Sequence, residues 1–251
     1  MKRIIAILLA LVCVAALVSC KKSEKMVIGI TEYEPMNYKD SSGKWIGFDT
    51  EFAEAACKKL GRTPEFKVID WETKEIELKA GNIDCIWNGL TVTEERRENM
   101  AFTSSYLINE QAIVVKAENA AKYTDKASFA GASFVAESES AGQTAVESDF
   151  PDAKFTAVES QAMTLLEVKA GTADAAVIDV TMARAMTGAG TDYADLVIVT
   201  GISLTNEEYA IGFKIGSEDV AKFNDIIKTF RSDGTLSKLA EKYGVADLLI
   251  K

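Results

Sequence analysis

The sequence turns from apolar to charged within one segment, Trp87-Asn88-Gly89-Leu90-Thr91-Val92-Thr93-Glu94-Glu95-Arg96. This order predicts the end of a buried strand, a loop and the first turn of a helix. Gly89 permits a turn or a close backbone approach, and Thr93 is a favourable N-cap. Free N–H groups at such a junction can bind a carboxylate, and the Arg96 guanidinium can add a bidentate contact. The alternative is that Thr93 only caps a helix and that Arg96 is a solvated surface charge.

A second copy of this pattern lies further along the chain. Residues 78–89 read LKAGNIDCIWNG, and residues 168–179 align with them without gaps as VKAGTADAAVID. Both segments predict a helix ended by Gly, then an Asp and a buried strand. Ligands bind beyond the carboxyl ends of parallel strands, so Gly89 and Asp179 would occupy equivalent ligand-facing positions in two similar halves. The alternative is that such helix–Gly–strand units recur in all α/β proteins.

The N-terminus reads as a secretory signal. Lys2-Arg3 precedes an apolar run that is short for a transmembrane span, and charged residues follow at once. Leu17-Val18-Ser19-Cys20 resembles a bacterial lipobox, which implies cleavage of residues 1–19 and a lipid on Cys20. Residues 20–25 would then be a lipid-anchored tether on the extracytoplasmic side of the membrane. The alternative is an ordinary signal peptide with an incidental Cys.

Composition excludes several classes of function. The net charge of −10 argues against nucleic acid as a partner, and the 48% hydrophobic content supports a real core. The chain has no His, which excludes His-dependent nucleophilic catalysis and His-ligated metal sites. We predict no cofactor and no metal, because no other metal-binding pattern takes the place of His. Cys57 and Cys85 either pair or remain as two buried free thiols.

The first half predicts one α/β lobe. Residues 26–30 and 66–69 read as strands, and Phe48 to Leu60 reads as an amphipathic helix with Asp49 as its N-cap. Tyr33 and Trp71 follow the ends of these strands and either line a cleft or belong to the core.

The second half predicts a similar lobe. A strand at residues 133–136 leads through the turn from Glu137 to Ser140 into a helix that Ser140 would cap, which gives a second anion-binding corner. A helix over 160–170 and the Asp179 strand follow. A return strand at 209–213 then crosses back, and amphipathic C-terminal helices would pack on the first lobe.

Several of these segments together resemble the polar amino-acid-binding proteins of bacterial ABC importers, the extracellular solute-binding proteins of family 3. The matching segments are Gly47-Phe48-Asp49, Asp70-Trp71, Gly81 to Asp84, Gly89 to Thr93 with Arg96, Phe102-Thr103, and Asp174 to Asp179. The resemblance covers nearly all of the chain after Cys20. It implies the α/β fold of type II periplasmic-binding proteins, with two α/β lobes joined by two hinge strands. Lobe one would comprise residues 26–113 and 211–251, and lobe two residues 114–210.

The resemblance also implies how a free amino acid would be held. Arg96 and the Thr91 backbone would bind its α-carboxylate, with Ser140 assisting from lobe two. Asp179, the Gly89 carbonyl and the Thr91 hydroxyl would bind its α-ammonium. The positions expected near the ligand side chain are Tyr33, Trp71, Asn88 and Glu137.

Two departures from the family pattern bear on specificity. Glu139 stands where the family commonly has Gly in the lobe-two loop, and Ile30 stands where several basic-amino-acid binders have an acidic residue. Ile30 argues against a lysine or arginine ligand, whereas Glu32 and Glu137 favour one.

The leading hypothesis is a non-enzymatic lipoprotein that delivers an amino acid to an ABC permease with its ATPase. The alternatives are a ligand-sensing lipoprotein, an enzyme similar to cyclohexadienyl dehydratases with Glu137 as the candidate acid, and a lipoprotein that only binds another protein.

Overall fold

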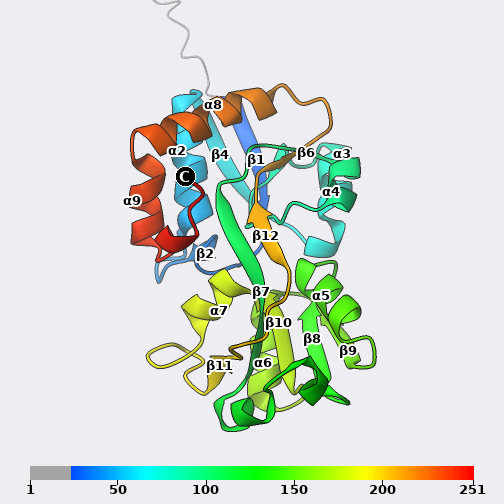
Figure 1. Ribbon diagram of the computed structural model, residues 1–251. Coiled ribbons are helices and arrows are strands. Elements are labelled where there is room, and N and C mark those ends of the chain that lie inside the picture. The colour runs from blue at the N-terminus through cyan, green and yellow to red at the C-terminus, as the bar shows by residue number, and fades with distance from the viewer. Residues whose placement is uncertain (1–23) are drawn as a thin grey trace, which may run out of the picture.

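The computed structural model describes residues 24–251, which form two α/β lobes connected by two strands (Figure 1). The predicted signal peptide and Cys20 lie outside the described residues. The first strand, β1 (Glu24–Ile30), already begins at Glu24, so Glu24 and Lys25 belong to the sheet and not to the predicted tether. Over residues 24–251, no helix is both long enough and apolar enough to cross a bilayer.

Lobe one is built on a five-stranded sheet in the order β4-β1-β5-β13-β6. The strands beside β1 are β4 (Arg62–Val68), β5 (Cys85–Ile86), β13 (Gly212–Phe213) and β6 (Ala101–Phe102). Strand β1 is parallel to β4 and β5, while β13 is antiparallel to both of its neighbours. A short hairpin, β2 (Tyr38–Lys39) and β3 (Trp45–Ile46), lies outside this sheet. The turn η1 (Trp71–Thr73) follows β4.

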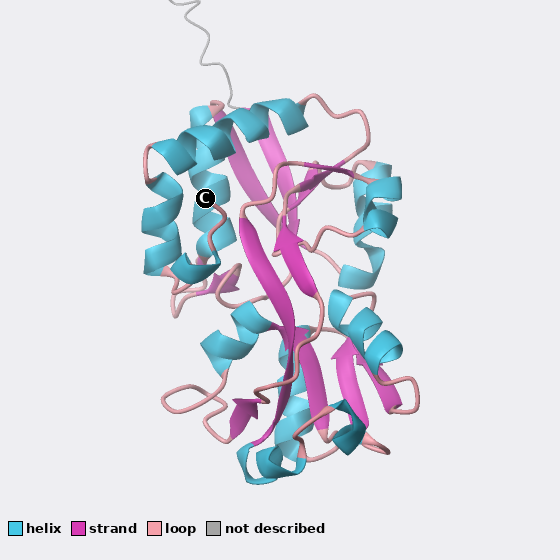
Figure 2. Ribbon diagram, in the orientation of Figure 1, coloured by secondary structure: helices cyan, strands magenta, loops and turns pink. Residues whose placement is uncertain are grey.

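Helices flank the sheet of lobe one, and Figure 2 shows its strands lying between them. These helices are α2 (Phe48–Lys59), α3 (Lys74–Ala80), α4 (Glu94–Asn99), α8 (Asp219–Ser232) and α9 (Thr235–Lys242). Helix α2 buries Phe48, Phe52 and Ala56 completely, as its four-residue apolar spacing predicts. The C-terminal helices α8 and α9 pack against α2, as expected, and the short turn η4 (Ala246–Leu248) follows them.

Lobe two has a sheet in the order β11-β7-β10-β8-β9. Its strands are β7 (Leu107–Lys116), β8 (Ser133–Glu137), β9 (Lys154–Val158), β10 (Ala175–Asp179) and β11 (Leu196–Ile198). Its helices are α5 (Ala141–Asp149), α6 (Gln161–Ala170) and α7 (Val180–Met186), with the turns η2 (Ala117–Lys122) and η3 (Lys126–Phe129) after β7. Strand β8 is parallel to β9 and β10, so it holds the same place in lobe two that β1 holds in lobe one.

Two strands run between the lobes side by side (Figure 1). Strand β12 (Asn206–Tyr209) pairs antiparallel with the first half of β7, from Leu107 to Glu110. The second half of β7 pairs with β10 from Gln111 onward. The predicted lobe boundaries at 113/114 and 210/211 therefore fall inside β7 and just after β12, and we propose these two strands as the hinge.

The repeated sequence segments form the same structural unit twice. Gly81 and Gly171 end α3 and α6 in the left-handed conformation, with φ of 77° and 81°. After each glycine turn an aspartate accepts a hydrogen bond from the backbone of the neighbouring strand. Asp84 binds the Val27 N–H at 2.7 Å, and Asp174 binds the Ser133 N–H at 2.8 Å. The ungapped alignment therefore corresponds to one βαβ device used in both lobes.

Two local expectations have clear outcomes. Asp49 is not the N-cap of α2: Gly47 holds that position, and the Asp49 side chain is buried beneath the helix. The N-cap therefore lies two residues earlier than predicted, and Phe48, the first helical residue, belongs to the core. Cys57 and Cys85 are both buried and free, in agreement with the second of the two alternatives.

Candidate functional site

A small cavity lies between the lobes, where the carboxyl ends of the central strands face each other. Its lining residues are Trp71, Asn88, Gly89, Thr91, Arg96, Glu137, Ser140, Ala141, Gln161 and Asp179. All the predicted ligand-binding residues except Tyr33 are among them, while Ala141 and Gln161 were not predicted. The cavity volume is about 10 Å³, close to the space of one water molecule. The cavity is therefore too small to hold an amino acid in this arrangement of the lobes.

Arg96 provides the cationic wall of this cavity. Its backbone N–H is held by the Thr93 hydroxyl oxygen at 3.1 Å, so Thr93 caps α4 as predicted. The guanidinium is buried; Nη1 donates to the Thr91 carbonyl at 2.9 Å, and Nη2 donates across the cleft to the Glu139 carbonyl at 3.1 Å. A buried guanidinium held by neutral carbonyls keeps its charge for an anion.

The lobe-two loop approaches Arg96 through its backbone. Glu139 has φ of 55°, the left-handed conformation that glycine adopts more readily. Its carbonyl accepts from Arg96 and also from Lys74 Nζ at 3.1 Å. The close approach that a family glycine would allow is thus made here by a strained glutamate. The next residue, Ser140, caps α5 by accepting from the Gln143 N–H at 3.1 Å, as predicted.

Asp179 provides the anionic wall. It ends β10 and is buried, and three amide groups donate to it: Asn109 Nδ2 at 2.6 Å, Gln111 Nε2 at 2.7 Å and Gln161 Nε2 at 2.5 Å. Burial raises the pKa of Asp179, and these amide donors act against that rise. Since amides add no positive charge, the carboxylate remains available to an ammonium group.

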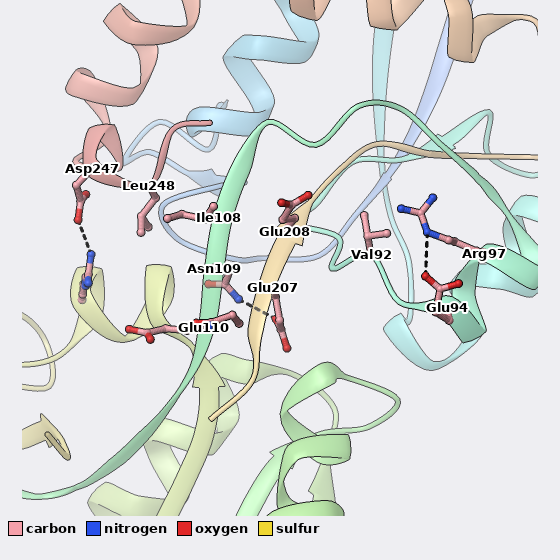
Figure 3. Close-up of a pocket in the computed structure, with 12 residues that line it drawn as sticks. Val92, Glu94, Arg97, Ile108, Asn109, Glu110, Glu207, Glu208, Asp247 and Leu248 are labelled. Carbon is pink, nitrogen blue, oxygen red and sulfur yellow. Dashed lines mark hydrogen bonds and ion pairs between the residues drawn. The ribbon is translucent and has the colours of Figure 1, made fainter. Parts of the chain in front are cut away.

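Glu207 on β12 is a second acid of this wall that the sequence did not reveal. It accepts from Asn109 at 3.0 Å, from Gln111 at 2.9 Å and from the Thr91 hydroxyl at 2.9 Å. Figure 3 shows the Asn109–Glu207 contact between the two crossing strands. Burial, and then the charge of Asp179, raise the pKa of Glu207 to about 7. Only the pairing of β12 with β7 brings this glutamate to the site, so no local motif marks it.

Tyr33 is the one predicted ligand-binding residue that the structure places outside this cavity. Tyr33 is buried but does not line the cavity, and its hydroxyl hydrogen-bonds Thr181 and, at 2.6 Å, the Tyr209 hydroxyl. Its ring fills the space beside Gly89, where an added Cβ would lie 2.6 Å from the Tyr33 Cε1 atom. The ring therefore supports the loop from behind instead of facing the cavity.

The Gly89 N–H is also not free for an anion. It donates to Asp49 Oδ2 at 2.7 Å, and the Tyr106 hydroxyl donates to the same oxygen at 2.9 Å. Burial raises the pKa of Asp49 to about 7. Asp49 thus positions the loop at Gly89 from within lobe one. The sequence did not predict this role, because an Asp near the start of a helix is usually an N-cap.

Asn88 lines the cavity, whereas Glu32 lies on the surface. The Asn88 amide donates to the Thr31 hydroxyl at 2.7 Å and accepts from the Thr31 N–H at 3.0 Å, which fixes the end of β1 beside the cavity. Glu32 is exposed and pairs with Lys39 at 3.4 Å. Glu32 therefore gives no support for a basic ligand. Among residues 24–251, no cluster of three or more acidic or Cys side chains could hold a metal ion.

The chain is similar in sequence to known amino-acid-binding proteins. The model of the bacterial extracellular solute-binding proteins, family 3, matches residues 26–246. The probable amino-acid-binding protein YxeM of Bacillus subtilis is 34% identical over 226 residues, which cover 86% of this chain and 82% of that protein. The ABC transporter glutamine-binding protein GlnH of Bacillus subtilis is 28% identical over 233 residues, with 90% and 84% covered.

Solved structures show the same architecture. An ancestral arginine-binding protein bound to arginine has a TM-score of 0.79 at 29% identity, with 87% of this chain and 97% of that chain covered. An ancestral amino acid-binding protein, a precursor of cyclohexadienyl dehydratase, has a TM-score of 0.80 at 29% identity, with 87% and 95% covered.

Proposed function

Because the chain belongs to the bacterial extracellular solute-binding proteins of family 3, we propose that it captures one free amino acid between its lobes for an ABC importer. Its relatives include an amino-acid-binding protein and an ABC transporter glutamine-binding protein, and its two lobes have the predicted type II periplasmic-binding fold. The proposed ligand contacts are Arg96 with the α-carboxylate and Asp179 with the α-ammonium. Closure of the lobes about β7 and β12 would then enclose the ligand.

One observation carries this proposal: a buried guanidinium from lobe one and a buried carboxylate from lobe two line a single cavity. A zwitterion with both α-groups satisfies both charges. A ligand that lacks one group leaves a desolvated protein charge without its partner, at a cost of about 3 to 5 kcal/mol. An added or missing methylene costs about 1 kcal/mol.

The test is calorimetry on the best-binding L-amino acid, its N-acetyl derivative and its amide, after a thermal-shift screen of all free amino acids. We expect the dissociation constant of each derivative to exceed that of the parent amino acid by a factor of about 10² to 10⁴. Binding of the N-acetyl form within threefold of the parent would remove Asp179 from the ammonium site. Turnover of a prephenate-like acid would instead support an enzyme similar to the dehydratases.

For the membrane anchor we propose the lipid on Cys20, supported by the sequence Leu17-Val18-Ser19-Cys20. Cys20 precedes both lobes in the sequence, so Cys20→Ser should release the protein from membranes with unchanged ligand affinity. Membrane association of the variant equal to that of the parent would exclude this anchor.

A further inference from the structure

Glu137 differs from Asp179, Glu207 and Asp49, the other buried acids near the cavity, in having no hydrogen-bond donor. It is the last residue of β8, its side chain lines the cavity, and 3% of the residue is exposed. Within the described chain, no backbone or side-chain group donates to its carboxylate, and no cation forms an ion pair with it. Burying an ionised carboxylate without a donor costs free energy. Because no protein group occupies its oxygens, the Glu137 carboxylate can still accept hydrogen bonds from a ligand.

The nearby protein cations are already engaged elsewhere. Lys74 Nζ donates to the carbonyls of Trp71 and Glu139, both at 3.1 Å. Arg96 donates to the carbonyls of Thr91 and Glu139. By contrast, three amides donate to Asp179, and two of them also donate to Glu207. The α-carboxylate and α-ammonium of a bound amino acid would pair with Arg96 and Asp179, which leaves Glu137 without an ion-pair partner.

We propose that Glu137 binds a positively charged group on the ligand side chain, so that the preferred ligand is a cationic amino acid with a guanidinium or an ammonium group. This inference rests on the proposed function and adds the substrate class. Trp71 lines the same cavity and already faces cations, with Lys74 Nζ 5.0 Å and Arg96 Cζ 6.0 Å from its ring centroid. Its indole can therefore also pack against a cationic ligand side chain.

A proton should accompany this ligand. Burial raises the pKa of Glu137 to about 8; the charge of Asp179 and, more weakly, that of Asp70 add to the rise, while Lys74 and Arg96 oppose it. Glu137 is therefore mostly protonated at pH 7 before a cation arrives. Since a cation favours the ionised form, binding should release up to about one proton.

The experiment compares ligands of equal shape and different charge. Arginine is paired with citrulline and lysine with norleucine, and calorimetry measures each dissociation constant. We expect at least one cation to bind at least tenfold more tightly than its neutral partner. In Glu137→Gln this ratio should fall below threefold. The matched control is Glu147→Gln, which removes an equal charge from an exposed side chain outside the cavity and should keep the ratio within twofold.

Proton release gives a second readout that separates ligand contact from folding. Calorimetry at pH 7 in phosphate and in Tris should show that the parent protein releases more protons with a cationic ligand than with its neutral partner. This difference should disappear in Glu137→Gln, and the melting temperature of that variant tests whether it is folded. Tighter binding of the neutral partners, or an unchanged ratio in Glu137→Gln, overturns this inference alone. Binding of no free amino acid overturns both this inference and the proposed function.

Discussion

The two lobes share a frame and differ in what the frame presents. In both, a left-handed glycine ends a helix and an aspartate binds the N–H of the neighbouring strand. The ends of the two repeats then differ: the repeat in lobe one ends in Gly89, which carries no side chain, and the repeat in lobe two ends in the carboxylate of Asp179. Positions that agree between the repeats therefore build the sheets, while positions that differ determine the chemistry of the cleft.

The largest expected effect is on the pH dependence of stability, because each lobe buries an acid near the cleft and the two acids can be removed separately. Burial raises the pKa of Asp49 in lobe one to about 7 and that of Glu137 in lobe two to about 8. Both values exceed those of the unfolded chain, about 4. The stability contributed by the protonated forms is thus complete below about pH 4 and is lost as pH rises through about 7 to 8.

We therefore expect the free energy of unfolding to fall from pH 5 to pH 8, by up to about 1.4 kcal/mol per pH unit for each group. Glu207 acts in the same direction, with a pKa of about 7. Urea unfolding at several pH values measures the slope. Asp49→Asn and Glu137→Gln should each flatten it, which assigns the effect to one lobe or the other. Stability that rises over this range in the parent protein would contradict the assignment.

A second test changes the two residues at which the repeats differ, by adding a side chain at Gly89 and by removing the charge at Asp179. Gly89→Ala adds a Cβ 2.6 Å from the Tyr33 ring at φ of 56°, so we expect a loss of about 2 to 4 kcal/mol of stability. Asp179→Asn retains the shape and should change stability by about 1 kcal/mol while greatly weakening ligand binding. Thermal unfolding together with calorimetry separates the two effects. A Gly89→Ala protein as stable as its parent would show that lobe one also tolerates a side chain there.

The smallest effect should come from the shared frame. Asp84→Ala and Asp174→Ala each remove an acceptor for a strand N–H, at a cost of about 1 kcal/mol. Because the two sites lie in different lobes, the double variant should be additive within about 0.5 kcal/mol. Asp152→Ala, at an exposed turn, is the neutral control. Markedly unequal losses of stability would mean that the two units, although similar in sequence, contribute differently to the free energy of unfolding.

The frame was predictable because its signals are local. Glycine caps, strand ends and the Thr93 and Ser140 caps all depend on neighbours in sequence, and the two-lobe fold was correctly predicted from them. Glu207, by contrast, meets Asn109 and Gln111 only through the pairing of two distant strands. The place of Tyr33 outside the cavity also depends on distant residues, since its partner hydroxyls on Thr181 and Tyr209 come from other parts of the chain.

The path of the chain through the sheets also sets an order of assembly. Lobe two is one continuous segment, whereas the sheet of lobe one places β13 between β5 and β6 and cannot be completed until residue 213 has been made. Contacts that close long loops form more slowly than local ones. We therefore expect amide protection during refolding to develop in β8 and β10 before β5 and β13, which pulsed hydrogen exchange can follow. The lobe that begins the chain should be the last to finish folding.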